Sequence, residues 1–279
     1  MAAAFNLLMR MFATVLVLGF AVAACSGPAV RSADPLAGTY IAATGEAAVP
    51  LAEALTKQLA TAHPGMTWTV SEVGSSASIS LVATGDADVA FITRELTAED
   101  RTMVAATGLG YMGQLIAVNR TNPVVGLSAE QLRGIFGGRI TDWSAVGGAP
   151  GPIRVFVRQE GSPTRAALDP LLVPAGAKYR ADAISVPDAS AMANALAASA
   201  GGIGMLSAPY VGSEANAPRA ITIEGVAPTH ENVATGRYAY RRPVYVVVRA
   251  NESLVRQGAR ALLDLLRSDE GRRVLAGFF

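Results

Sequence analysis

The fold is decided by residues 67–94, which read TWTVSEVGSSASISLVATGDADVAFITR. Residues 67–73 alternate between polar and apolar side chains over most of their length, which predicts a half-buried strand. Gly74-Ser75-Ser76 then predicts a turn into a helix that runs to about residue 84. Residues 87–92 are mostly apolar and predict a buried strand. A strand, a helix and a second strand in this order are the building block of a parallel sheet.

The residues before and after this stretch extend the same pattern. Residues 39–43 predict a short strand, and residues 50–62 predict a helix that a proline opens. Thr97, followed by Asp100, predicts the capped start of a helix over residues 97–106. In such alternating folds ligands bind beyond the carboxyl ends of the parallel strands, so we expect the site there.

The pattern begins again after residue 118, which indicates a second lobe. The remaining predicted strands are residues 111–118, 153–157, 203–206, 221–226 and 244–249, and the remaining predicted helices are residues 128–136, 165–172, 190–199, 253–266 and 269–275. The expected class is α/β, with two doubly wound sheets in two lobes joined by a hinge that the chain crosses twice. The predicted lobes are residues 38–117 together with 227–279, and residues 118–226.

Three predicted loops carry small hydroxyl residues with or near arginine. The first N–H groups of a helix lack partners within the helix, and the helix dipole adds positive charge there, so a tetrahedral anion can bind. An arginine adds a full charge and a planar set of donors. Each loop alone would be read as an ordinary turn or cap, but together they predict an oxyanion site. The loops are Gly74-Ser75-Ser76, Phe91-Ile92-Thr93-Arg94 and residues 158–165.

Length and composition limit the classes of protein. A chain of 279 residues fits two domains of moderate size. Hydrophobic residues make up 51% and charged residues 16%, which excludes a disordered chain. Lys and Arg number 23 against 22 Asp and Glu, so no basic field attracts nucleic acid over long range.

The first 24 residues differ from the rest of the chain. A single Arg10 precedes an apolar run over residues 11–24 that ends in small residues before Cys25, the only cysteine. The segment resembles a bacterial lipoprotein signal peptide, which implies that Cys25 is lipidated and becomes the mature N-terminus. A plain signal peptide with a chance cysteine is the alternative. Residues 25–37 predict a tether, so we expect an extracytoplasmic protein anchored in the cell membrane by lipid.

Short motifs follow one another in order along nearly all of the mature chain. They resemble those of the phosphate-binding proteins of ABC-type phosphate importers, which have a two-lobed, type II periplasmic-binding-protein fold. The resemblance is carried by PLAEAL at residues 50–55, GSSA at 74–77, GDADVA at 85–90, TREL at 93–96, LSAEQL at 127–132, GRITDW at 138–143, RQEGSPT at 158–164, PTHENV at 228–233, RPVY at 242–245 and SDEG at 268–271.

The resemblance implies a function and a set of binding residues. In that family hydroxyls, backbone N–H groups and an arginine bury phosphate in a cleft between the lobes, which close over it. It implies inorganic phosphate or a similar oxyanion as ligand, an ABC permease as partner, no cofactor and a monomer. The residues that match the family's binding loops are Ser75, Ser76, Thr93, Arg94, Arg158, Ser162 and Thr164.

One departure from the family pattern is Glu46, which stands where the family carries hydroxyl residues. Its carboxylate could accept the proton of hydrogen phosphate and thereby exclude sulfate. It could instead pair with Arg94 or Arg158, or it could point into solvent. The sequence leaves these three readings open.

A second departure is Pro163, where the family has glycine. Proline suits the first turn of a helix but removes one N–H donor from the loop. We therefore expect a retained fold with an altered ligand preference or affinity. The alternative function is a lipoprotein that serves as a sensor or interaction module, with a retuned or degraded oxyanion site.

The sequence does not predict an enzyme. It has no Gly-x-Ser-x-Gly or phosphate-loop motif, and its sole cysteine precedes the folded region. His63 and His230 are far apart and lack the spacing of metal ligands, so no metal site is expected. Arg242 is read as a packing or hinge residue, together with Asp142, Trp143, Asn232 and Pro243.

Overall fold

The structure is a computed structural model that describes residues 34–212 and 216–279. The predicted signal peptide, Cys25 and most of the predicted tether lie outside the described residues. Residues 35–279 form one compact unit. Within the described ranges, no helix combines the length and the apolar character needed to cross a membrane.

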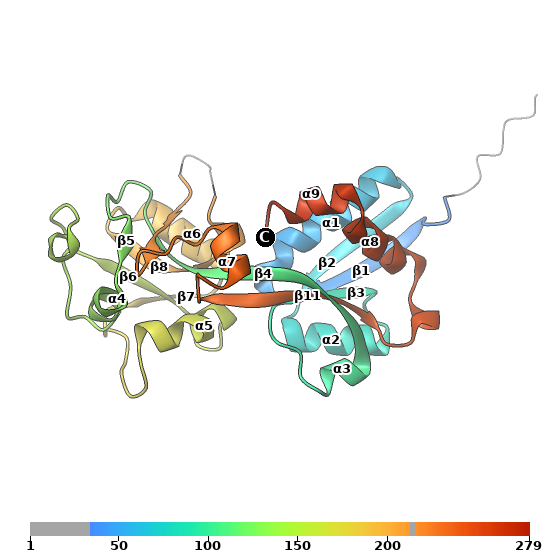
Figure 1. The fold of residues 1–279 in the computed structure, drawn as a ribbon, viewed down its shortest axis with the longest axis horizontal. Helices are drawn as coiled ribbons and strands as arrows, with labels where there is room; N and C mark the ends of the chain where they lie inside the picture. The colour runs from blue at the N-terminus through green and yellow to red at the C-terminus, as the bar shows by residue number, and fades with distance from the viewer. Residues whose placement is uncertain (1–33, 213–215) are drawn as a thin grey trace, which may run out of the picture. The chain divides into compact units, whose positions relative to one another are not determined.

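Helices and strands alternate along most of the described chain (Figure 1). The strands are β1 (Gly38–Thr44), β2 (Met66–Glu72), β3 (Val89–Ile92), β4 (Val104–Val118), β5 (Gly126–Leu127), β6 (Arg154–Arg158), β7 (Ile184–Val186), β8 (Gly202–Ser207), β9 (Arg219–Ala220), β10 (Thr222–Ile223) and β11 (Arg241–Arg249). The α-helices are α1 (Val49–Ala62), α2 (Ser75–Thr84), α3 (Asp100–Met103), α4 (Ala129–Phe136), α5 (Pro163–Leu172), α6 (Ala189–Ala198), α7 (His230–Thr235), α8 (Gln257–Arg267) and α9 (Asp269–Leu275). The predicted α/β class is confirmed.

The main sheet has the strand order β2-β1-β3-β11-β4-β8-β6-β7, with β9 added beside β4. Strands β1, β2 and β3 are parallel to one another, and so are β6, β7 and β8. Strand β11 lies antiparallel between β3 and β4. The parallel groups correspond to the two runs of alternating strands and helices read from the sequence.

Strand β4 connects these groups. Its residues from Val104 to Gly113 pair with β11, and its residues from Gln114 to Val118 pair with β8. One continuous strand therefore contributes to both halves of the sheet.

Three buried hydrophobic clusters support the sheet. One packs β1, β3 and β11 against α1 and α8, and a second packs the opposite face of these strands against α2. In Figure 1, α1 and α8 lie on one side of these strands and α2 on the other. The third cluster is formed by residues between 115 and 238 and packs β4, β6 and β8 against α4, α5 and α6. These cores fix the strand ends from which the site loops arise.

The structure corrects three predicted elements. The helix expected over residues 97–106 is reduced to α3, because residues 104–106 pair with β11 as part of β4. The helix expected over residues 253–266 begins only at Gln257 as α8, after a separate short turn of 3-10 helix. The strand expected over residues 221–226 shrinks to β10, because Glu224 adopts a positive φ of 51° and turns the chain.

Candidate functional site

A cavity of about 630 Å³ lies at the carboxyl ends of β1, β2, β3, β6 and β7. This is where open parallel sheets bind ligands, and the volume falls in the usual range for small-molecule sites, about 300–1,000 Å³. Its lining residues are Gly45, Glu46, Ala47, Glu72, Gly74, Ser75, Ser76, Thr93, Arg94, residues 158–163, Pro187, Asp188 and Arg242. The cavity thus gathers most of the site residues predicted from sequence.

The loops after β2 and β3 form one wall of the cavity. Gly74 has a φ of 82°, which glycine adopts at little cost, and it lets β2 turn directly into α2. The Ser75 hydroxyl accepts a hydrogen bond from the Thr93 backbone N–H at 3.2 Å. Ser75 and Thr93 are therefore tied together, although they belong to different loops.

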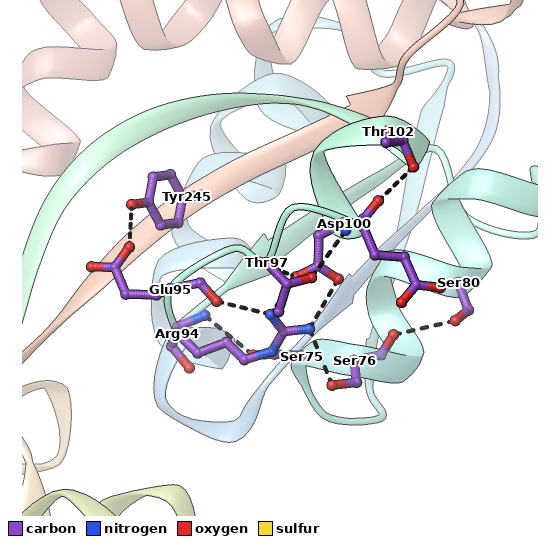
Figure 2. A network of polar contacts seen from close by, with 11 residues as sticks. Ser75, Ser76, Ser80, Arg94, Glu95, Thr97, Asp100, Thr102 and Tyr245 are labelled. Carbon is purple, nitrogen blue, oxygen red and sulfur yellow. Dashed lines mark hydrogen bonds and ion pairs between the residues drawn. The ribbon is translucent and has the colours of Figure 1, made fainter.

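Arg94 lines the cavity, but its charge is already paired (Figure 2). Its Nη1 donates to the Asp100 carboxylate at 2.6 Å, and its Nη2 donates to the Ser76 hydroxyl at 3.2 Å. This bond from Arg94 is the main reason that the pKa of Asp100 falls to about 2. Thr97 and Asp100 also exchange two hydrogen bonds, but the helix that Thr97 was expected to cap begins only at Asp100, with Glu99 at its N-cap position. Arg94 is thus held by Asp100 and Ser76, and its ion pair is with Asp100 and not with Glu46.

Arg158 projects from the end of β6 and is 3% exposed. Its Nη2 donates to the Glu46 carboxylate at 2.8 Å and to the Pro187 carbonyl at 3.0 Å. Its Nε and Nη1 are buried without a hydrogen-bond partner among the described residues. Unpaired buried donors are costly, so this guanidinium favours an anion in the cavity.

Glu46 is the acceptor that holds Arg158. Its second carboxylate oxygen accepts a hydrogen bond from the Ala189 backbone N–H, at the start of α6. The side chain is 14% exposed. Of the three readings left open by the sequence, the structure shows the pairing with Arg158. In this arrangement the Glu46 carboxylate binds both the N-terminus of α6 and the Arg158 guanidinium. These are the kinds of group that bind an oxyanion.

Residues at the start of α5 have two different surroundings: some line the cavity and one is buried in the core. Ser162 caps α5 and, with Pro163 at the first helical turn, lines the cavity. Thr164 does not line it. The Thr164 hydroxyl is buried and lies 3.0 Å from the Ser207 hydroxyl, which donates to Gln114 at 3.1 Å. In this structure Thr164 is part of a buried polar chain, in contrast to the ligand contact that the family resemblance implies.

The structure adds charged residues that the sequence reading missed. Arg242, read as a packing or hinge residue, lines the cavity, and its Nε is buried without a hydrogen-bond partner among the described residues. The pKa of Arg242 falls to about 10, mainly because the group is buried; the charge of Glu46 opposes the fall and the charge of Arg158 adds to it. Glu72 and Asp188 also line the cavity. Burial raises the pKa of Glu72, with the charges of Glu46 and Asp188 adding to the rise. The sequence feature that could have identified these three residues is their position at or near the ends of strands.

The side chains that line the cavity suit an anion better than a metal ion. No group of three or more His, Cys, Asp or Glu side chains within residues 34–212 and 216–279 could hold a metal ion. What the cavity offers is two arginines with free buried donors, hydroxyls at helix starts, and one carboxylate already bound to Arg158.

The chain is similar in sequence to phosphate-binding proteins. The chain is 27% identical over 251 residues to the phosphate-binding protein PstS of Bacillus subtilis, covering 86% of this chain and 79% of that protein. An ABC-type phosphate transport receptor from Vibrio cholerae is 27% identical, with a TM-score of 0.63 over 85% of this chain and 97% of that one.

A phosphate ABC transporter substrate-binding protein from Clostridium perfringens, solved with bound phosphate, has the same fold. It is 24% identical, with a TM-score of 0.72 over 86% of this chain and 97% of that one. Residues 29–270 match the family model described as a PBP superfamily domain. Because that match covers most of the chain, the protein belongs to the PBP superfamily.

Proposed function

We propose that this protein is an extracytoplasmic solute-binding lipoprotein that captures inorganic phosphate and delivers it to an ABC importer. The observation that carries the proposal is the buried guanidinium of Arg158, which lines the cavity with two donors unpaired among the described residues. Phosphate offers acceptors on all its oxygens, as such a site requires. The phosphate-binding relatives point to the same ligand.

The two lobes and the cleft between them belong to this proposal. The division into residues 38–117 with 227–279, and residues 118–226, is supported by hydrophobic clusters that draw mainly on one range or the other. The cavity receives Ser75 and Thr93 from the first range and Arg158 and Ser162 from the second. A ligand that contacts both ranges would favour a closed arrangement over an open one.

Isothermal titration calorimetry tests the ligand directly. The full-length chain, purified in detergent and phosphate-free buffer, is titrated with phosphate, arsenate and sulfate. Tight binding of phosphate and arsenate is the expected result. Binding of sulfate alone, or of none of the three, contradicts phosphate capture.

The lipid anchor needs a separate experiment. Intact mass spectrometry of the protein from bacterial membranes should show a chain that begins at Cys25 and carries lipid, whereas a Cys25→Ser variant should carry none. A mature chain that begins elsewhere, without lipid, contradicts the anchor.

The delivery step is tested in cells. Uptake of radiolabelled phosphate should fall when the gene is deleted and recover when the intact gene is restored. Unchanged uptake at low external phosphate contradicts a transport role, and it favours the sensor or interaction module. That second function is supported by one observation, the occupation of Arg158 by Glu46.

We also propose that the protein binds and does not catalyse. The curated relatives are named as binding proteins. Recovery of unchanged phosphate, and of intact phosphate esters, after prolonged incubation is the expected result. Release of phosphate from an ester would contradict it.

A further inference from the structure

Arg242 is a further arginine in the cavity lining, besides Arg158 and the paired Arg94. It stands at the start of β11, on the strand face that also carries the buried Val244 and Val246. The residue lines the cavity together with Arg158. The charges of Arg158 and Glu46 both act on it.

The packing does not account for the unpaired donor. Burying a polar group without a partner costs free energy, and a nearby positive charge adds to that cost. Arg242 Nε has no hydrogen-bond partner among the described residues, and neither do Arg158 Nε and Nη1. Glu46, the carboxylate that acts on both arginines, forms its hydrogen bonds with Arg158 and the Ala189 N–H.

The acidic and basic side chains that line the cavity differ in their exposure to solvent. Glu160 and Asp188 are exposed, so solvent screens them, and Glu72 is exposed too, although partial burial raises its pKa. The unpaired atoms of Arg158 and Arg242 are buried, where solvent screens charge much less. An anion that reaches the buried part of the cavity therefore meets two guanidiniums with free donors.

We propose that Arg242 is a ligand-binding residue, and that the bound oxyanion is shared between its guanidinium and that of Arg158. The inference rests on the proposed phosphate function and adds a contact that the family resemblance did not assign. It gives a physical reason for keeping an unpaired cation in the structure: the anion supplies the missing acceptor. Arg242 thus serves binding at the expense of the stability of the empty protein.

The test compares Arg242→Gln and Arg242→Lys with the unaltered full-length chain in detergent. Phosphate affinity is measured by calorimetry, and the melting temperature is measured with and without phosphate. Arg267→Gln is the matched control, because Arg267 is 73% exposed and lies outside the lining of the cavity.

Removing a charged hydrogen-bond donor should weaken phosphate binding at least about tenfold in Arg242→Gln. Arg242→Lys should fall between Arg242→Gln and the unaltered chain, because lysine keeps the charge and loses the planar fork. The phosphate-free melting temperature of Arg242→Gln should stay level or rise, because an unpaired buried cation is gone. A merely structural arginine would lower it.

A loss of affinity smaller than tenfold in Arg242→Gln overturns the inference. So does a loss accompanied by a lower phosphate-free melting temperature, which would assign Arg242 to the scaffold. If the unaltered chain binds phosphate and Arg242→Gln binds equally well, only this inference fails. If the unaltered chain does not bind phosphate, the proposed function fails and the inference fails with it.

Discussion

Glu46 and Arg158 are 112 residues apart in the sequence, and a hydrogen bond of 2.8 Å joins their side chains. The pair places a carboxylate against the guanidinium that an oxyanion would use. An incoming anion must either displace Glu46 or bind to the remaining donors of Arg158 beside it. The pair therefore sets how readily the cavity accepts a ligand.

The first prediction concerns Glu46→Gln. Removing the competing negative charge should tighten phosphate binding about tenfold, or about 1.4 kcal/mol. The unliganded protein should lose about 1–3 kcal/mol of unfolding free energy, because buried Arg158 loses its ionised partner. Calorimetry measures the first quantity and denaturant unfolding the second.

Glu53→Gln is the control for this prediction. Glu53 is exposed on α1 and is not among the lining residues, so both quantities should stay near those of the unaltered chain. Weaker phosphate binding in Glu46→Gln would contradict the displacement model. It would indicate instead that the Glu46 carboxylate accepts the proton of hydrogen phosphate.

A second prediction concerns acid stability through Asp100. Its pKa falls to about 2 in the folded chain, mainly through the bond from Arg94, against about 4 for an unfolded Asp. The stabilising contribution is therefore complete above about pH 4 and is lost as the pH falls toward 2. Because Arg94 is 31% exposed, solvent limits the contribution to about 1–2 kcal/mol.

Unfolding free energies of the unaltered chain and of Asp100→Asn, measured from pH 5 to pH 2, check this contribution. The difference between them should shrink as the pH falls. Asp264→Asn is the control, since Asp264 is 75% exposed. A difference that stays constant across the range would show that Asp100 acts through packing and not through its charge.

The third prediction concerns Gly74, which has a φ of 82° and a ψ of 154°. Only glycine adopts this region readily, so Gly74→Ala should cost about 1–3 kcal/mol of unfolding free energy. A Cβ at this position meets no atom within 4 Å, so backbone strain is the sole direct cause. Phosphate affinity should also fall, because the strain lies at the start of α2.

Gly147→Ala is the matched comparison for Gly74→Ala. Gly147 has a φ of 80° and an equally open surrounding, but it lies outside the cavity lining. It should cost about 1 kcal/mol and leave phosphate affinity unchanged. Equal affinity losses in the two variants would rule out a specific role for the turn at Gly74.

The fourth prediction concerns the buried chain of Thr164, Ser207 and Gln114. Thr164→Val removes a hydroxyl and leaves Ser207 with one partner fewer, so unfolding free energy should drop by about 1–3 kcal/mol. Thr164→Ser keeps the hydroxyl and should lose less. Denaturant unfolding compares the two, and a larger loss in Thr164→Ser would contradict the polar role.

Local signals predicted much of the fold. The helix expected over residues 269–275 is α9 from end to end, because the Ser268 side chain caps it within the same short segment. The start of α4 likewise follows from a reciprocal cap between Ser128 and Gln131. Such contacts lie within a few residues, so the sequence displays both partners side by side.

Elements that depend on distant partners were predicted less well. Residues 104–106 read as the end of a helix, yet they pair with β11, which follows much later in the chain. From the sequence, Arg242 was interpreted as a hinge or packing residue. Its place in the cavity lining could not be predicted, because it depends on β11 lying between β3 and β4. The pairing of Glu46 with Arg158 could be named beforehand only as one of several readings, since no local pattern selects among distant charges.

The continuous strand β4 has a thermodynamic consequence. Gly113 pairs with β11 and the adjacent Gln114 pairs with β8. The residues on either side of this pair, Met112 and Leu115, belong to different hydrophobic clusters. Melting either cluster would strip partners from a strand that the other cluster also requires. We expect heat to unfold the described chain as one cooperative unit, with a single calorimetric peak, although its hydrophobic residues are divided among separate cores.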